Sequence, residues 1–234
     1  MATIKEIVYD LKNIIRGGMQ SDDEIISDRQ IEFQVDSLRA QFIRQDINKR
    51  RSISDNIKQI IPAMELISVP AALAGVSMDG NILRSKNKIP NAIETSHSDL
   101  ITAIGPTGVL SMNFHMIPYN RVPWVGSNRY TKRMQFAFLL DSYVYVIGPD
   151  IEFIERIKVE GVWQNPRDIS AYMGANGAKA YDPETHDYPL STSMLDMIKQ
   201  SMLTQNLQPL VQMPTDTTNN SRSDAQQARP NTQR

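Results

Sequence analysis

The chain contains 234 residues, enough for one domain with appendages, and 41% of them are hydrophobic, which suffices for a core. Its 25 Lys and Arg residues nearly balance 26 Asp and Glu residues; the net charge of −1 argues against a dedicated nucleic-acid binder, which usually carries a basic excess. The absence of cysteine excludes disulfides, thiolate metal sites and cysteine nucleophiles.

The amino-terminal sequence lacks the apolar core of a signal peptide. No apolar run approaches the roughly 20 residues that a helix needs to cross a bilayer. We therefore expect a protein that folds in a cytoplasm, is soluble and contacts no membrane.

Two amphipathic helices, joined at Gly17 and Gly18, are predicted over residues 3–15 and 21–50, because apolar residues recur at helical spacing in both. Thr3-x-x-Glu6 and Ser21-x-x-Glu24 each fit a capping box, which places a helix start at both sites. The apolar positions of the second helix are Ile31, Val35, Leu38 and Phe42. A long hairpin without a catalytic motif favours assembly over chemistry.

The second predicted helix also carries Arg39 and Arg44 among alternating basic and acidic residues. This pattern is typical of a solvated, salt-bridged helix face. The alternative is a face that meets complementary charges on a neighbouring subunit. Under that alternative, both arginines join the apolar positions in a subunit interface.

Residues 52–61 are predicted to form a short helix, or to continue the preceding one, and to stop at Pro62, because proline disrupts a helix interior. Beyond it, turn residues separate short apolar runs that predict strands. These strands are expected at 81–84, 100–104 and 109–114. The Gly-Pro-Thr-Gly sequence at 105–108 predicts a hairpin between the last two.

The strongest β pattern is at 134–147, where two runs of aromatic and β-branched residues flank Asp141 and Ser142. It predicts a hairpin with a tight turn, although neither turn residue is the glycine that a primed turn favours. Residues 153–162 alternate polar and apolar side chains and predict another strand, with one face on the core and one in water. Asn165-Pro166 ends it.

A late helix is predicted at 189–205, with Ser191 or Ser193 as its cap. Its expected buried stripe is Met194, Met197, Ile198 and Met202. Large aliphatic side chains are absent beyond Pro214. Residues 214–234 are therefore predicted to be disordered unless a partner orders them.

No motif for catalysis or cofactor binding stands out. The three histidines, His97, His115 and His186, have no partner at metal-ligand helical spacing. Residues 182–187 offer oxygen ligands but lack the spacing and central glycine of a calcium loop, so an exposed polar loop is favoured. We expect no enzymatic activity, no cofactor and no metal.

Residues 118–133 combine aromatic and basic side chains. Such combinations bind single-stranded nucleic acid, and they also form the energetic centres of protein interfaces. The balanced charge of the chain favours a loop that packs on another subunit. Its expected contact residues are Tyr119, Arg121, Trp124, Arg129 and Tyr130.

These patterns predict an α+β fold in four parts. An N-terminal helical hairpin occupies 1–61, and a β-rich central region with antiparallel hairpins occupies 62–188. A C-terminal helix and extension follow at 189–213, and a tail that is disordered or ordered by a partner occupies 214–234.

Several short strings resemble a known group of proteins. They are 4–18, 28–31, 43–49, and 158–163 with the following Asn165-Pro166. These strings look like virion structural proteins of crAss-like and related short-tailed bacteriophages. The order of elements is similar to that of ring proteins in the head-to-tail connector, and the resemblance spans residues 1 to about 213.

The resemblance implies a homo-dodecameric ring at the head–tail junction of the virion, below the portal protein and beside other connector or tail proteins. Such a ring surrounds the channel through which phage DNA passes, and joins head to tail while lining or sealing that channel. It implies neither catalysis nor a cofactor. The balanced charge agrees with this role, because many Lys–phosphate contacts would hold DNA rather than let it slide.

Three alternatives stay open from the sequence. The chain is another virion component, such as a tail or capsid accessory protein; or an enzyme whose site contains His97, Asp99 and Tyr119; or a single-strand-binding module built on residues 118–133.

Overall fold

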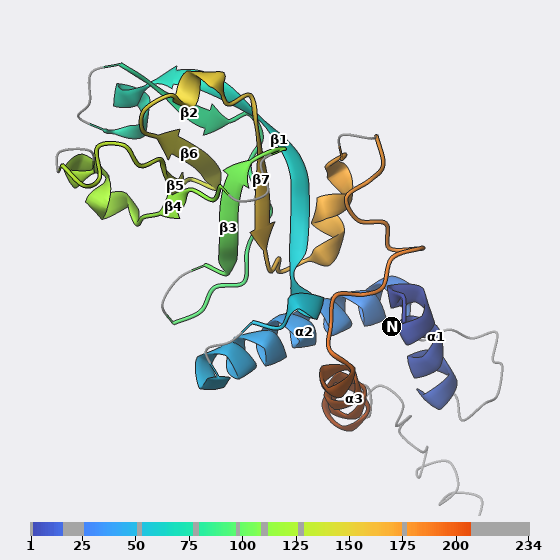
Figure 1. Cartoon of the computed structure of the whole chain (residues 1–234). Helices are drawn as coiled ribbons and strands as arrows, with labels where there is room; N and C mark the ends of the chain where they lie inside the picture. The colour runs from blue at the N-terminus through green and yellow to red at the C-terminus, as the bar shows by residue number, and fades with distance from the viewer. Residues whose placement is uncertain are drawn as a thin grey trace, which may run out of the picture.

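A computed structural model describes residues 2–15, 26–50, 53–76, 80–96, 99–108, 112–125, 129–174 and 177–206. Three helices pack together on one side of a seven-stranded sheet (Figure 1). The α+β class and the order of helices, strands and late helix agree with the prediction. Within the described residues, no helix is long and apolar enough to cross a membrane.

Helix α1 spans Ile4–Ile15 and begins at the predicted capping box. The Glu6 backbone N–H donates to Thr3 Oγ1 at 3.3 Å, and the Thr3 backbone N–H donates to Glu6 Oε2 at 2.9 Å. Two amide donors of the first turn, which have no partner inside a helix, are thereby satisfied.

Helix α2 spans Asp28–Arg50, so the predicted start at Ser21 is wrong. Ile26 and Ser27 are not helical, and Ser27 Oγ accepts a hydrogen bond from the Gln30 backbone N–H at 3.3 Å. Ser27-x-x-Gln30 is itself a capping-box sequence, and it lies next to the apolar stripe that packs in the core. The predicted box at Ser21 and the Gly17-Gly18 junction lie outside the described residues.

The helix predicted at 52–61 is wrong. After a short 3₁₀ turn, η1 (Asp55–Ile57), the chain enters β1, the longest strand (Gln59–Pro70). Pro62 lies inside this strand, where the pairing of β1 with its neighbour shifts register between Ile61 and Met64. A register shift of this kind tolerates a residue without a backbone N–H, so proline does not end the element.

The sheet has the strand order β3-β7-β1-β2-β6-β5-β4. Neighbouring strands are antiparallel except β4 and β5, which are parallel. The remaining strands are β2 (Asn81–Ser85), β3 (Ile101–Pro106), β4 (His115–Met116), β5 (Phe136–Leu140), β6 (Tyr143–Ile147) and β7 (Arg156–Gly161). The short turns are η2 (Ala71–Ala74), η3 (Tyr119–Trp124), η4 (Ile151–Phe153) and η5 (Pro166–Ala171).

The hairpin predicted over 100–114 is tested only in part, because residues 109–111 lie outside the described residues. Strand β3 pairs along its length with β7, a strand far away in sequence. Residues 112–114 lie beside β3 without joining a strand, and the Phe114 backbone N–H donates to Ile104 O at 2.7 Å. The sequence around β3 could not identify β7 as its partner, because the alternation of polar and apolar residues in β7 is compatible with pairing to any strand of the sheet.

The hairpin predicted over 134–147 is confirmed. Strands β5 and β6 pair in register, from Phe136 opposite Ile147 to Leu140 opposite Tyr143. Both residues of the connecting turn have positive φ, 52° at Asp141 and 65° at Ser142. This is the dihedral pattern of a type I′ turn, which matches the twist of the two strands.

Strand β7 shows the predicted alternation but begins later than predicted. Ile157, Val159 and Gly161 are buried, and the residues between them face outward. Residues 151–153 form the turn η4 instead of strand. Asn165 ends the region as predicted and accepts from the Arg167 backbone N–H at the start of η5.

Helix α3 spans Thr192–Ser201 and continues into a π-helical turn, η6 (Met202–Asn206). Ser191 Oγ caps it by accepting from the Met194 backbone N–H at 3.4 Å. Three of the four predicted stripe residues are buried, but Met197 is 44% exposed and lies off the stripe. The predicted tail, 214–234, lies outside the described residues.

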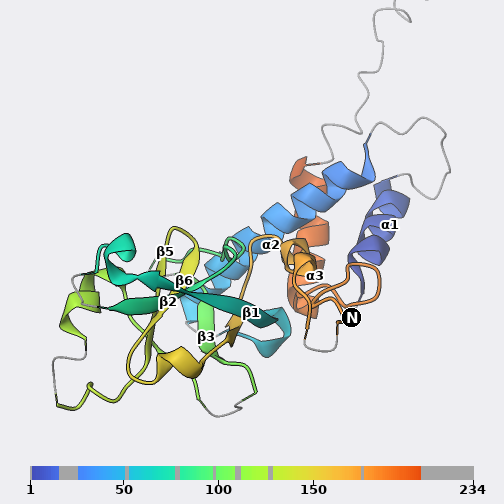
Figure 2. The ribbon, with the colours of Figure 1, turned by 90° about the horizontal axis from the view of Figure 1, so that it is seen from above.

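The three helices lie side by side (Figure 2) and share one hydrophobic cluster. Ile93, Leu100 and Val162 from the β region and Ile57 before β1 belong to the same cluster, so the helices pack against segments that flank the strands. Two further clusters fill the sheet region itself.

We predict that the double substitution Asp141→Asn with Ser142→Gly stabilises the protein, because Asn-Gly adopts positive φ at lower cost than Asp-Ser. The free energy of unfolding, measured by urea denaturation, should rise by roughly 1 kcal/mol. Ser142→Val is the opposed control and should lower it, since a β-branched residue resists positive φ. An Asn-Gly variant less stable than the wild type would contradict this account of the turn.

Candidate assembly surfaces

The apolar residues of α2 predicted to form a subunit interface lie inside the chain itself. Ile31 and Val35 are fully buried, Leu38 is 9% exposed, and Phe42 packs partly buried against the same cluster. Their neighbours in this cluster include Ile4, Ile7, Val8 and Leu11 of α1 and Met194 and Ile198 of α3. The α2 stripe therefore packs against α1 and α3 of the same chain.

Arg39, also predicted at the interface, is completely buried between α2 and the segments after β7. Its Nε donates to Pro189 O at 2.8 Å, and its Nη1 donates to Trp163 O at 2.7 Å. Burial lowers the pKa of the guanidinium from its ordinary value, because desolvation disfavours the charged form. Arg39 thus acts inside the subunit and ties α2 to two distant parts of the chain.

A network of polar side chains lies beside this arginine, whose guanidinium carbon is 5.7 Å from the centroid of the Tyr188 ring. Asp36, which is 8% exposed, accepts from the Tyr188 hydroxyl at 2.7 Å and from Arg167 Nη2 at 2.5 Å. Arg167 also pairs with Glu32, one turn earlier on α2. Buried ionised groups are stable only when they are paired and hydrogen-bonded, and this network meets that condition for Asp36.

Arg44, the other predicted arginine, remains exposed on α2. Its Nε donates to Glu94 O at 2.8 Å, and nearby Ser96 Oγ is 3.2 Å from Asn48 Oδ1. These bonds hold the segment around residues 94–96 against the carboxyl-terminal half of α2. Arg44 therefore holds the 94–96 segment in place, and its own side chain remains exposed to solvent.

The predicted aromatic and basic contact residues form a surface that we call the ridge, made of residues 119–125 and 129–133. Its base is fixed: Val122 is buried, and the Tyr119 hydroxyl donates to Ala74 O at 2.8 Å. The Tyr119 ring lies 5.9 Å from the Phe138 ring of β5. The ridge is therefore attached to the sheet by specific contacts.

Large aromatic side chains project from this fixed base. Trp124 is 77% exposed and Tyr130 is 80% exposed, and Arg121 and Arg129 are also exposed. Within the described part of the chain, no salt bridge joins either arginine to a carboxylate. Exposed Trp, Tyr and Arg side chains on a rigid base are typical of interface hot spots.

The residues of the enzyme alternative come together only in part. Asp99 and Tyr119 line one groove of about 710 Å³, and Glu94 lies in it too. Burial, and then the charge of Glu94, raise the pKa of the Asp99 carboxyl. His97 lies outside the described residues, and the Tyr119 hydroxyl is bonded to a backbone carbonyl.

Neither of the other two histidines lines that groove. His115 belongs to β4, and its ring is 5.8 Å from the Phe136 ring of β5. His186 Nδ1 accepts from the Asp182 backbone N–H at 2.9 Å, within the 182–187 loop. Among the described residues, no three His, Asp or Glu side chains converge as they would around a metal ion.

The 182–187 loop is organised by its own hydrogen bonds. Asp182 accepts from the Glu184 backbone N–H and from Thr185 Oγ1, and these bonds lower the pKa of its carboxyl. Glu184 forms an ion pair with Lys5 of α1 at 2.5 Å. The loop is thereby joined to the first helix.

Three exposed aromatic residues were not predicted from the sequence. Tyr9 on α1 is 69% exposed, Phe33 on α2 is 71% exposed, and Phe153 in η4 is 84% exposed. Tyr9 and Phe33 fall outside the apolar stripes of their helices, and that offset is the sequence signal that would have identified them. All three lie outside the ridge.

Comparisons with known proteins match almost the whole chain. A profile of the family described as phage tail ring protein 2 matches residues 6–226. Ring protein 2 of Bacteroides phage crAss001 is 24% identical over 241 residues, which cover 97% of this chain and 100% of that protein. Both matches include the helices, the sheet and the ridge.

We predict that the hydrogen bond from the Tyr119 hydroxyl to Ala74 O requires glycine at position 75. Gly75 has φ +66°, and a Cβ there would lie 2.7 Å from the Tyr119 hydroxyl oxygen. Gly177 is a matched control, since it has φ +75° and open space around its Cβ. Gly75→Ala should lower the free energy of unfolding by about 1 kcal/mol more than Gly177→Ala, because it also disturbs the Tyr119 hydrogen bond.

Urea denaturation of both variants, in the wild type and in a Tyr119→Phe background, measures this difference. The excess should vanish when the hydroxyl is absent. An excess that persists in Tyr119→Phe would show that another contact is responsible.

We predict that stability falls at alkaline pH because of Tyr188. Burial raises the pKa of its hydroxyl well above the ordinary value of about 10. Above that pH the unfolded chain loses this proton while the folded chain keeps it. The free energy of unfolding therefore falls as pH rises, with a limiting slope of about 1.4 kcal/mol per pH unit.

Urea midpoints in Tyr188→Phe provide the check. This variant should be less stable below pH of about 10 by roughly 1.5–3 kcal/mol, through loss of the bond to Asp36, and should show a shallower alkaline decline. Tyr9→Phe, at an exposed tyrosine, should behave like the wild type. An unchanged slope in Tyr188→Phe would contradict the prediction.

Proposed function

Because the chain belongs to the phage tail ring protein 2 family and is therefore a structural protein of a phage tail ring, we propose that this ring is part of the connector between head and tail. In this role the ring joins the portal side to the tail and lines or seals the DNA exit channel. We further propose that twelve copies form it, as the resemblance in sequence implies. The main support for this proposal is the family match over residues 6–226, which includes every described helix and strand apart from the first two residues of α1.

The charge of the chain supports a position around DNA. A net charge of −1 provides no general excess of cations to hold phosphates. A protein that surrounds moving DNA benefits from few contacts between its cations and the DNA phosphates. Each such contact releases counterions and so strengthens binding of the DNA.

The rigid construction of the subunit supports a role in assembly. A closed ring needs two different surfaces on each subunit, related by rotation about the ring axis. The ridge supplies one such surface: its aromatic residues are exposed while its base is bonded to the sheet. The proposed interface residues are therefore Tyr119, Arg121, Trp124, Arg129 and Tyr130, with the exposed Arg44 beside a different loop.

Electron microscopy of purified phage particles tests the position of the ring. We expect density for this chain at the head–tail junction, in a ring around the channel. Particles that contain the chain only in the capsid shell or at the distal end of the tail would overturn the connector role. Particles that lack the chain would overturn the virion role as well.

We predict that the double variant Trp124→Ala with Tyr130→Ala folds normally but is not incorporated into particles. Both side chains are exposed, so the free energy of unfolding should change by less than about 0.5 kcal/mol. Loss of two hot-spot residues should weaken each contact by roughly 2 kcal/mol or more. Quantitative mass spectrometry of purified particles measures incorporation.

Phe153→Ala is the control for this experiment, because Phe153 is equally exposed but lies outside the ridge. It should be incorporated like the wild type. Normal incorporation of the double variant would remove the ridge from the proposed interface.

A further inference from the structure

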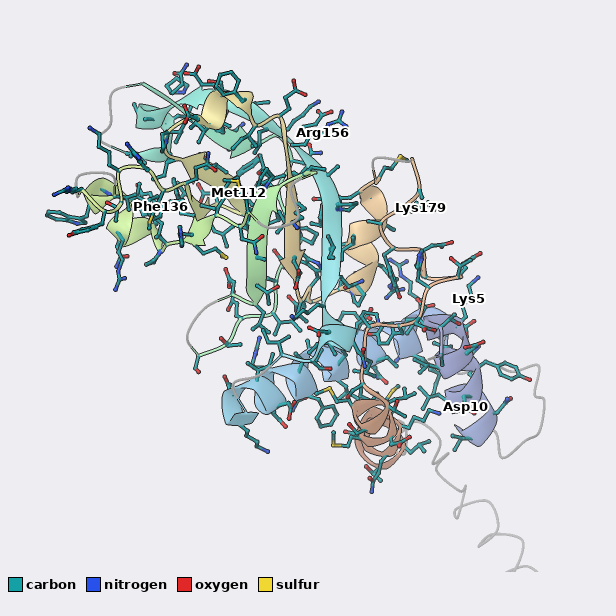
Figure 3. The ribbon with its side chains drawn as sticks, in the orientation of Figure 1. Lys5, Asp10, Met112, Phe136, Arg156 and Lys179 are labelled. Atoms are coloured by element: carbon teal, nitrogen blue, oxygen red, sulfur yellow. The ribbon has the colours of Figure 1, made fainter. Side chains whose placement is uncertain are left out.

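The ridge and helix α1 lie at opposite ends of the molecule. Figures 1 and 2, seen from directions 90° apart, both place η3 at one end and α1 at the other. Figure 3 shows the labelled Lys5 and Asp10 of α1 at the helical end, away from Phe136 of β5. A head-to-tail ring joins one surface of each subunit to a different surface of the next subunit, and two surfaces at opposite ends of the chain suit such a contact.

The ridge end is basic and aromatic. Residues 118–133 contain four Lys and Arg residues and no carboxylate. Trp124 and Tyr130 stand exposed among these cations. A partner for this end should offer an apolar depression bordered by negative charge.

The helical end has an apolar groove of about 460 Å³ beside α1, lined by Ala2, Lys5, Glu6, Ile7, Tyr9, Asp10 and Lys199. Two lysines and two carboxylates balance in this lining, so an excess of negative charge must come from a neighbouring segment.

An acidic loop is attached next to this groove. Residues 181–187 contain three carboxylates and no Lys or Arg. The ion pair between Glu184 and Lys5 joins the loop to α1, and the Tyr188 backbone N–H donates to Ala2 O at 3.1 Å. Lys5 itself lines the groove.

We infer that the ridge of one copy docks on the α1 groove and the acidic loop of the next copy, head to tail around the ring. This inference rests on the proposed function, since it names the contact that closes the proposed ring. The aromatic residues of the ridge enter the apolar groove, and Arg129 and Arg133 face the acidic loop. Complementary charge then fixes the direction of the contact, because two ridges or two acidic loops repel each other.

A second copy fits the ridge better than DNA does. DNA would satisfy the arginines but would leave the acidic loop and the α1 groove at the other end of the molecule without a role. A copy of the same chain satisfies both ends with one contact. Because the contact is heterologous, it continues from subunit to subunit until the ring closes.

The absence of cysteine makes a direct test possible, since engineered thiols are the only ones in this chain. A Tyr9→Cys, Lys132→Cys double variant keeps the ridge residues Trp124 and Tyr130, and particles assembled with it are treated with a flexible bis-maleimide. Tyr9 borders the groove and Lys132 lies on the ridge, and both are exposed. We expect a ladder of covalent oligomers that extends well beyond the dimer on denaturing gels.

The matched control pairs Tyr9→Cys with Phe153→Cys, which is exposed but lies outside the ridge, and it should give no ladder. Products that stop at the dimer would overturn the head-to-tail contact, and so would particles that contain the double variant but yield no ladder. Absence of the unaltered chain from wild-type particles overturns the proposed function instead, so the two failures are distinguishable.

Charge reversal separates a second copy from DNA as the partner. Arg129→Glu with Arg133→Glu should reduce incorporation at least tenfold. Adding Glu184→Lys, Lys5→Glu and Asp187→Lys to the same chain should restore incorporation, because the two reversed surfaces attract again while the ion pair between positions 5 and 184 is kept in inverted form. If the ridge bound DNA, the added lysines would not restore it, and that result would overturn the inference.

Discussion

One buried arginine holds the helices and the strands of this protein together. Arg39 extends from α2 and donates to the backbone oxygens of Trp163 and Pro189, which are remote from it in sequence. A fully buried guanidinium is stable only where such acceptors are fixed, so its presence requires the segments after β7 to lie where they do. Tyr188, Asp36 and Arg167 continue this network toward the surface.

This network gives the subunit two rigid ends. The helices cannot shift relative to the segments after β7 without breaking the bonds of Arg39 to two backbone oxygens and the ion pair of Asp36 with Arg167, and the loss of such bonds to buried charges is strongly destabilising. The apolar cluster shared by the three helices, Ile93 and Val162 acts in the same direction. The ridge and the α1 groove are therefore held at a fixed separation, as a ring of identical subunits requires.

The sequence predicted those features that depend on local contacts. The capping box of α1, the hairpin of β5 and β6, the alternation in β7 and the Ser191 cap of α3 all involve residues close in sequence. The exposed aromatic residues of the ridge were also predicted, from composition alone. The start of α2 was wrong because a second capping sequence at Ser27 lies closer to the buried stripe. The strand β1 was missed because Pro62 suggests a break.

Amino-acid order by itself determined the fold class, most element positions and the kinds of side chain available for contact, because those properties depend on spacing and composition. The tertiary structure decided which side chains remain available. Ile31, Val35 and Arg39 resemble interface residues in sequence, yet packing directs them inward, because α1, α3 and the segments after β7 reach them within the same chain. Trp124 and Tyr130 stay exposed on a loop whose base is bonded through Tyr119 to Ala74 O.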